Sequence, residues 1–277
     1  MDDNDYNVVT DLRLKRTIRD YWLTKETDGN RVLVRRQINE KDGNVFSMKE
    51  LIANELGITE VKGDTRQKIR EQLPAKFIDV RAFGVVGTVK DANVALTGPV
   101  QFAIGRSLNK PNIKSYTISS TIASEEGKGQ GSLGEFHTVD YSLIMFHGIA
   151  CEYNANETKF TEEDLKYVYE GIWNGTKRLN TRSKTNHVPR LLFAVVSKEK
   201  EFQIGDLDKG FVLEEETIKG PEEANINISR LLERLTQFKD SIKAIELKED
   251  GSLTFTDGTK TSNQIEDFLD GFNVIHI

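Results

Sequence analysis

The segment TEEDLKYVYEGIWNG (Thr161–Gly175) carries the clearest helical pattern in the chain. Thr161 has a side chain suited to the N-cap, and Asp164 three residues later makes a variant of the capping box. An apolar face at helical spacing consists of Leu165, Val168, Tyr169, Ile172 and Trp173. The pattern predicts a helix that packs on a core through this face and ends at Gly175.

Apolar runs lie on both sides of this helix. YSLIMFHGIACEY (Tyr141–Tyr153) precedes it, and PRLLFAVVS (Pro189–Ser197) follows it. Continuous apolar runs bounded by turn residues predict buried strands. Helices and strands that interleave in this way, with long irregular insertions, predict an α+β domain.

Near the start of the chain, a second amphipathic helix is predicted from Asp11 to Trp22, with Thr10 as its cap. Its apolar face holds Leu14, Ile18, Tyr21 and Trp22. Its cations, Arg13, Lys15, Arg16 and Arg19, are expected on the opposite arc. Such a face neutralises phosphates in some proteins and is simply solvated in others, and the helix alone does not decide between the two.

The remaining elements are predicted more coarsely. Strands are expected at Arg31–Ile38, from Lys76 through Val89, and within Val94–Asn109, where Pro99 indicates an edge or a bulge. Helices are expected at Ser47–Leu56, Asp64–Leu73 and Ile228–Phe238, and a strand at Ile242–Lys248. Residues 110–134 are polar and glycine-rich, which predicts a long hairpin or mobile loop. Hairpins are expected at 198–216 and at Asp250-Gly251, followed by a short helix and a strand-like tail.

Composition narrows the classes of protein. No run approaches 18 apolar residues, so no membrane span is expected, and the first residues lack the pattern of a secretory signal. The single cysteine, Cys151, suits a reducing cytoplasm. The net charge is −6, yet residues 199–277 hold 9 Lys/Arg against 18 Asp/Glu, which leaves 29 against 26 in residues 1–198. Any nucleic-acid surface is therefore expected in the first two-thirds.

No motif indicates an enzyme. GQGSLG (Gly129–Gly134) matches GxGxxG but lacks the strand before it and the helix after it that a dinucleotide site needs. The chain has no Walker motif, no HExxH and no metal-ligand spacing among its four histidines, so no cofactor or metal is expected. RAFGVV (Arg81–Val86) is similar to a strand signature of RNA-recognition motif (RRM) domains, although an ordinary buried strand explains it as well.

Several segments in order resemble one family. They are VVTDLRLKRTIRDYW, FIDVRAFGVVG, LTGPVQFAIGRSLN, and the region from YSLIMFHG through TEEDLKYVYEGIWN to TRSK. Together they cover most of Val8–Ser197 and are similar to the Cas-seven family of CRISPR proteins, within the RAMP superfamily, most closely to its type I-B branch. The C-terminal third matches only in general shape.

The resemblance implies an RRM-like (ferredoxin-like) palm with an inserted finger (39–75), a thumb-like Gly-rich hairpin or loop (110–137), a polar hairpin (198–216) and an acidic C-terminal part (217–277), all within one domain. It implies a non-enzymatic Cascade backbone subunit that polymerises along CRISPR RNA with copies of itself and with other Cascade subunits, and leaves the bases free to pair with target DNA. The implied RNA-binding residues are Arg13, Lys15, Arg16, Arg19, Arg106, Ser107, Asn109, Lys128, Arg182 and Lys184, together with the loop Ser119–Gly134.

One departure and two alternatives stay open. Family members usually begin with an apolar strand, and this chain starts in the loop MDDNDYN, so the first strand of the palm is expected to be absent. A type III-like RNA endonuclease would use acidic residues near the first helix, where Asp2, Asp3 and Asp5 lie and where Mg²⁺ could bind. An RNA-independent assembly module would use the acidic C-terminal third as its contact surface.

Overall fold

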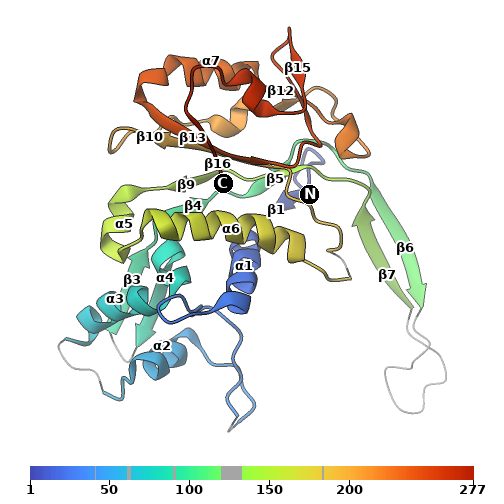
Figure 1. Ribbon diagram of the computed structural model, residues 1–277. Helices are drawn as coiled ribbons and strands as arrows, with labels where there is room; N and C mark the ends of the chain where they lie inside the picture. Colours follow the sequence, from blue (N-terminus) through green and yellow to red (C-terminus); the bar gives the residue numbers. More distant parts are fainter. Residues whose placement is uncertain (41, 61–63, 90–91, 120–132, 183) are drawn as a thin grey trace.

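A computed structural model describes residues 1–277 except 41, 61–63, 90–91, 120–132 and 183 (Figure 1). The described residues form seven α-helices and several small sheets, which confirms a mixed α and β fold. The helices are α1 Asp11–Trp22, α2 Met48–Leu56, α3 Thr65–Lys76, α4 Ile78–Phe83, α5 Glu152–Thr158, α6 Glu162–Arg178 and α7 Ser229–Gln237. The RRM-like arrangement and the division into insertions stay predictions.

Six sheets of two to four strands are found in this part of the chain, with orders β1-β5-β8, β10-β13-β16, β11-β12-β14-β15, β2-β3, β4-β9 and β6-β7. The strands are β1 Val8–Val9, β2 Gly84–Val89, β3 Ala92–Thr97, β4 Val100–Phe102, β5 Gly105–Ser107, β6 Ile113–Ser119, β7 Leu133–Val139, β8 Ile144–Met145, β9 Gly148–Ala150, β10 Leu191–Ser197, β11 Val212–Leu213, β12 Asn225–Asn227, β13 Ile242–Glu249, β14 Thr254–Thr256, β15 Thr261–Ser262 and β16 Val274–His276.

The helices α1 and α6 pack against each other at the centre of the molecule, where α1 runs steeply below α6 in the view of Figure 1. Both predicted caps are present, Thr10 on α1 and the Thr161–Asp164 capping box on α6. The prediction that Gly175 ends α6 is wrong, because the helix continues to Arg178. A Cβ at Gly175 would lie 2.9 Å from the backbone oxygen of Thr17, so this glycine serves close helix packing.

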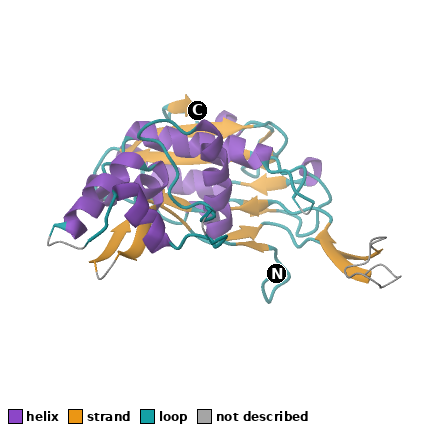
Figure 2. Ribbon diagram, turned by 90° about the horizontal axis from the view of Figure 1, so that it is seen from below, coloured by secondary structure: helices purple, strands orange, loops and turns teal. Residues whose placement is uncertain are grey.

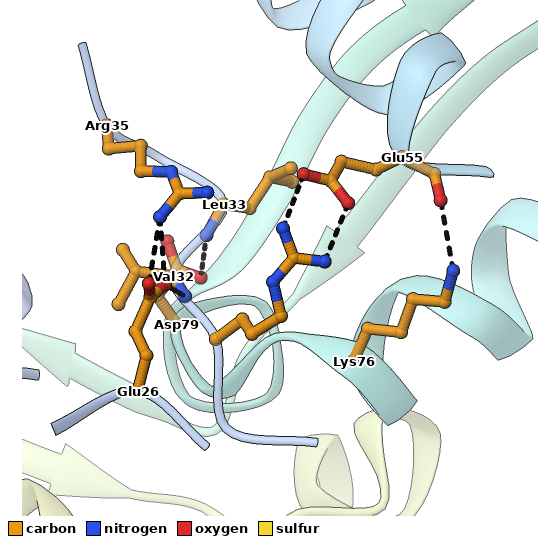
Figure 3. Close-up of polar contacts among 8 residues, drawn as sticks. Glu26, Val32, Leu33, Arg35, Glu55, Lys76 and Asp79 are labelled. Carbon is orange, nitrogen blue, oxygen red and sulfur yellow. Dashed lines mark hydrogen bonds and ion pairs between the residues drawn. The ribbon is translucent and has the colours of Figure 1, made fainter. Parts of the chain in front are cut away.

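The strand predicted at Arg31–Ile38 is wrong, since only isolated bridges occur there. The amides of Val32 and Leu33 donate to the carboxylates of Glu26 and Asp79 instead of to a neighbouring strand (Figure 3). The Leu33 N–H donates to Oδ1 of Asp79 over 2.8 Å, and the Val34 N–H donates to Oδ2 over 3.0 Å. The adjacent side chains of Val32 and Leu33 are therefore buried in the core from a loop rather than from a strand.

The strand predicted from Lys76 begins only at Gly84, because Ile78–Phe83 forms the helix α4. The interpretation of Arg81–Val86 as a strand signature is wrong for the same reason. The Arg81 guanidinium is held inside the protein by Asp164, at 2.9 Å, and by the carbonyl oxygens of Gly29 and Pro74. Phe83 stacks on Trp22 with ring centroids 5.5 Å apart, so it belongs to the core.

The long buried strand predicted at Tyr141–Tyr153 is also wrong. Only the short strands β8 and β9 form there, β9 is exposed, and α5 begins at Glu152. The start of the run is bound by a side chain, because Asn109 donates to the carbonyl of Tyr141 and accepts from the N–H of Leu143. A side chain thus takes the place of a neighbouring strand.

The hairpin β6–β7 is the most extended feature of the described residues. The two strands pair antiparallel from Ile113↔Val139 to Ser119↔Leu133 and project from the body in both views (Figures 1 and 2). This pairing confirms the hairpin rather than the loop alternative for residues 113–119 and 133–139. Residues 120–132, including Lys128 and most of the predicted guide-contacting loop, lie outside the described residues.

The C-terminal third has its own apolar core, to which α7 contributes Leu231 and Leu235. The helices predicted at Ser47–Leu56, Asp64–Leu73 and Ile228–Phe238 are confirmed as α2, α3 and α7, and β13 confirms the strand at Ile242–Lys248. The predicted strand β10 forms but is half-buried along its length. The two predicted hairpins are wrong, because β11 pairs with β12, and β14 pairs in parallel with β12 rather than with β13.

Candidate nucleic-acid interface

Two of the four cations on α1 point into the protein. Lys15 is 8% exposed, and its ammonium donates to Oε1 of Gln101 over 2.8 Å. The Nε of Arg19 lies 2.9 Å from Oδ2 of Asp79, which is fully buried. The prediction that both side chains lie on a solvated arc is therefore wrong, because α4 and β4 cover a second side of the helix. Contact of either residue with RNA stays a prediction.

The other two cations of α1 are better placed for a ligand. The Arg16 side chain is 64% exposed and pairs with Asp20 one turn away, at 2.6 Å. An exposed pair of this kind contributes at most ~1 kcal/mol, so Arg16 can leave it for a phosphate. Arg13 is half-buried in the first turn, and its Nε is buried without a hydrogen-bond partner. Both residues stay candidates for phosphate binding.

The loop that follows α6 brings further basic groups to the first turn of α1. The pKa of His187 in this loop is lowered by desolvation and by the positive charges of Arg13 and Lys184. The Arg182 guanidinium lies 5.2 Å from the ring centroid of Phe136 on β7. The loop after α6 therefore contacts the β6–β7 hairpin through the predicted residue Arg182.

A second basic group surrounds Tyr6. The Arg106 guanidinium lies 3.8 Å from the centroid of the Tyr6 ring, and the Lys110 ammonium lies 5.4 Å from it. Arg106 also pairs with Asp2 at 2.7 Å, and Lys110 pairs with Glu216 at 2.7 Å. The hydrogen bond from Lys110 lowers the pKa of Glu216. Each cation of this group is thus paired with a carboxylate at the surface.

Ser107 and Asn109 have internal roles. Ser107 is 3% exposed, donates to the carbonyl of Asn109 over 2.6 Å and accepts from the N–H of Asn7 over 2.8 Å. Asn109 is fully buried, and its side chain hydrogen-bonds to the backbone of Tyr141 and Leu143 just before β8. These contacts use both side chains to hold β5 against its neighbours. Their direct contact with RNA stays a prediction.

The acidic residues at the start of the chain do not form an open cluster. Asp2 accepts hydrogen bonds from the amides of Asn4 and Tyr6 at 3.0 Å and pairs with Arg106. Desolvation acts to raise the pKa of Asp2, but these hydrogen bonds outweigh it and the pKa is lowered. Within the described ranges, no group of three or more His, Cys, Asp or Glu residues is arranged to hold a metal ion.

Sequence reasoning missed Tyr6, Lys110, Phe136 and His187 as neighbours of the predicted cations. Phe136 lies directly opposite Tyr116 in the hairpin, and Tyr116 is 52% exposed. Aromatic residues beside cations in a polar segment are a usable signal, because aromatic rings and guanidinium groups together bind single-stranded nucleic acids. His187 had no such signal, since only the fold brings it to Arg13.

Taken together, the described residues offer cations and aromatic rings from five segments: the chain start, α1, the region of β5 to residue 110, the β6–β7 hairpin and the loop after α6. Arg and Lys side chains at these positions can neutralise phosphates, and the exposed rings can stack on bases. In the same part of the chain, no helix is both long and apolar enough to cross a membrane.

Comparison with known proteins identifies the family. The family model described as CRISPR-associated protein Cas7 matches residues 1–230, so the chain belongs to the Cas7 family, the Cas-seven family of the sequence analysis. A curated relative from Haloferax volcanii, named CRISPR-associated protein Cas7, is 26% identical over 284 residues, which cover 94% of this chain and 82% of the relative.

Two solved structures are more distantly similar. One is titled CRISPR RNA-guided surveillance complex, with a TM-score of 0.46 and 12% identity over 92% of this chain and 78% of the other. The second, titled CRISPR RNA-guided surveillance complex, pre-nicking, has the same TM-score and identity over 98% of this chain and 88% of the other. A TM-score at this level carries no argument about fold or function.

Proposed function

We propose that this protein is a CRISPR-RNA-binding backbone subunit of a type I surveillance complex, Cascade. Several copies would bind along one guide RNA beside other Cascade subunits and leave its bases free to pair with target DNA. The observation that carries the proposal is the Cas7 family match over residues 1–230, the part of the chain in which cations gather. An RRM-like palm and a cytoplasmic location belong to the same proposal.

The placement of the exposed cations supports binding to the RNA backbone. Arg16 on α1, Arg182 after α6 and Arg106 on β5 are each at least partly exposed, and each contact is of a kind that a phosphate can replace. Contacts of this kind are salt-dependent and carry little sequence information, because they read phosphates rather than base edges. A guide RNA of any sequence would therefore bind.

The experiment measures RNA affinity by fluorescence anisotropy at several salt concentrations. A triple variant, Arg16→Ala, Arg106→Ala and Arg182→Ala, is compared with Lys209→Ala, Lys219→Ala and Lys243→Ala, which removes three exposed cations from the acidic third. We expect the first variant to bind more weakly and to lose about 0.7 in salt slope for each lost phosphate contact. The control should bind like wild type. Equal effects of the two variants would contradict the proposed surface.

The proposal includes a scaffold without catalytic activity. The same protein is incubated with Mg²⁺, guide RNA and complementary RNA, and the products are separated on a denaturing gel. Intact RNA is the expected result. Cleavage that is lost in Asp3→Asn or Asp5→Asn would instead support an endonuclease, and self-association without any RNA binding would support an assembly module.

A further inference from the structure

The strand β10 has the composition of a central strand but lies at the edge of its sheet. Its sequence LLFAVVS (Leu191–Ser197) is apolar up to the last residue, and every position is only half-buried. The sheet order β10-β13-β16 gives β10 a partner on one side only. Continuous apolar runs are typical of strands with neighbours on both sides, whereas edge strands usually carry charges or proline that prevent further pairing. The outer edge of β10 therefore has the character of a pairing surface.

The backbone of β10 alternates between bonded and unbonded groups. Beside β10, the N–H of Lys198 donates to the carbonyl of Ser241 over 2.8 Å, so the even-numbered residues face β13. The odd-numbered residues turn their N–H and C=O groups to the outer edge. Within the described ranges, these groups have no hydrogen-bond partner in Leu191, Phe193 and Val195.

The segment through β8 and β9 has a second open edge. The carbonyls of Leu143 and His147 accept hydrogen bonds over 2.8 Å from the N–H groups of Leu108 and Ala103, so the odd-numbered residues face β4 and β5. The even-numbered residues turn their backbone groups outward, where the described part of the chain offers no partner. They are Ile144, Phe146, Gly148 and Ala150.

Both edges border the same apolar region. Leu143 is buried in the core against which the outer-edge residues of β10 pack. The helix α6 reaches both sheets, because Ile172 and Phe146 pack against one core and the Trp173 ring centroid lies 5.5 Å from the Lys248 ammonium on β13. Among the described residues, no ladder connects β8 or β9 with β10. The two edges thus share a helix and a core without pairing with each other.

The order of the elements indicates which strand belongs between these edges. The elements α1, β4–β5, β8–β9, α6 and β10 follow one another in the chain and correspond to a β-α-β-β-α-β motif without its first strand. In this split arrangement, the first strand lies between the two strands that the second helix joins. Those two are β8–β9 and β10, the strands with open edges.

We propose that one apolar strand inserts between β8–β9 and β10 and pairs with both, and that it belongs to the same polypeptide ahead of residue 1. The strand β1 cannot take this place, because it pairs with β5, and residues 1–7 are mostly polar. The inserted strand would be about five to seven residues long and apolar on both faces, since one face meets α6 and the other the C-terminal core. This inference rests on the RRM-like palm of the proposed function and identifies the segment that completes it.

The first test uses the protein isolated from the cells that make it. Its intact mass should exceed the 31.4 kDa of residues 1–277. The amides of Phe193 and Val195 should exchange with deuterium about as slowly as those of Leu192 and Ala194, which face β13. Slow exchange at a mass of 31.4 kDa would mean that another chain supplies the strand, and fast exchange would mean that no strand binds. Either result would overturn the proposal.

The second test adds a strand to residues 1–277. A segment of about seven Val and Ile residues flanked by lysines is joined to Met1 by about 20 Gly and Ser residues. It should slow exchange of the outer amides at least about tenfold and raise Tm by about 5 °C or more. The matched control carries proline at three of the apolar positions, which removes their N–H donors, and should behave like residues 1–277 alone. Equal behaviour of the two extended chains would contradict a strand site.

A substitution at the edge itself checks the pairing. Val195→Pro removes an N–H that faces the open edge, and proline is tolerated on the unpaired side of an edge strand, so residues 1–277 should keep nearly the same Tm. In the extended chain, the substitution should cancel most of the gain in Tm. An undiminished gain would show that the added strand does not pair with β10.

RNA affinity in the same preparations separates this inference from the proposed function. A protein that binds RNA while the outer amides of β10 exchange rapidly refutes the inference alone. A protein with slow exchange at both edges that fails to bind RNA refutes the proposed function and leaves the strand site in place.

Discussion

The Nε of Arg19 on α1 lies 2.9 Å from Oδ2 of Asp79 on α4, and the carboxylate of Asp79 is completely buried. The same carboxylate accepts hydrogen bonds from the backbone amides of Leu33 and Val34. One side chain thus connects two helices and the loop 31–35. The pair explains why α1 keeps a cation on a face that is closed to solvent.

Removal of Arg19 should destabilise the protein strongly. Arg19→Ala leaves the buried carboxylate of Asp79 without its cation, which typically costs about 3–5 kcal/mol. Arg16→Ala breaks only an exposed pair with Asp20 and should cost less than about 1 kcal/mol. Urea unfolding of both variants measures the difference. Equal losses of unfolding free energy would show that the Arg19–Asp79 pair is not a structural anchor.

A methyl group at Gly175 should also destabilise the fold. Alanine favours a helix over glycine by about 0.5–1 kcal/mol, so Gly175→Ala would be stabilising in an isolated helix. Here the new Cβ would lie 2.9 Å from the backbone oxygen of Thr17, and overpacking of this kind costs about 1–3 kcal/mol. Thermal unfolding should therefore show a lower Tm. Lys166→Ala, at an exposed position of α6, is the control and should leave Tm nearly unchanged.

Stability should depend on the ionisation of Glu249 on β13. Burial raises the pKa of Glu249, and the carboxylates of Glu266 and Asp267 raise it further, against the hydrogen bond from the Ile265 amide. The folded state therefore binds the proton more tightly than the unfolded state, so stability is lost as the pH rises from the ordinary pKa of 4.5 through the raised value. Glu249→Gln should remove this loss.

The measurement compares the unfolding free energies of wild type and Glu249→Gln between pH 4 and 7. We expect the variant to gain stability relative to wild type as the pH rises, because glutamine keeps an acceptor for the Ile265 amide without the charge. Glu233→Gln, on the exposed side of α7, provides a control with the same change of charge. A constant difference across the pH range would refute the role assigned to Glu249.

Local signals in the sequence were enough to predict five of the seven described helices, whereas α4 and α5 lie in segments that were not predicted as helical. The two predicted caps, Thr10 and Thr161, act on neighbouring amides, and both are present. A strand depends on hydrogen bonds to a partner strand that is distant in the chain. Two strand predictions were wrong because a side chain, rather than a partner strand, bonds to the backbone of the predicted strand. Asp79 does so for the amides of 33–34, and Asn109 does so for the chain at 141–143.

The candidate site was also predictable only in part, because local sequence patterns do not show which segments pack together. Basic residues on α1 are visible in the sequence, but helical periodicity alone does not show that α4 and β4 cover Lys15 and Arg19. The nearness of His187 to Arg13 depends on how the loop after α6 folds back, which no local pattern encodes. Residue type therefore indicated the chemistry of the surface, and tertiary packing decided which side chains reach it.

Asp2 should compete with RNA for Arg106. The carboxylate of Asp2 lies 2.7 Å from the Nε of Arg106, and its lowered pKa keeps it ionised at neutral pH. A phosphate that binds Arg106 must displace this carboxylate, so part of the binding free energy is lost in breaking the pair. Asp2→Asn should therefore bind RNA more tightly, by about two- to fivefold, since an exposed ion pair contributes little and is easily replaced. The asparagine oxygen can still accept the hydrogen bonds from the amides of Asn4 and Tyr6.

Asp3→Asn is the matched control, because it changes the net charge by the same amount one residue away, and Asp3 is exposed. Long-range attraction between the protein and RNA rises equally in both variants, so the difference between them reports the pair with Arg106 alone. In the background of Arg106→Ala, Asp2→Asn should lose its advantage over Asp3→Asn. If the two asparagine variants bind RNA equally well while Arg106 is present, Asp2 acts only through net charge and Arg106 does not contact the RNA.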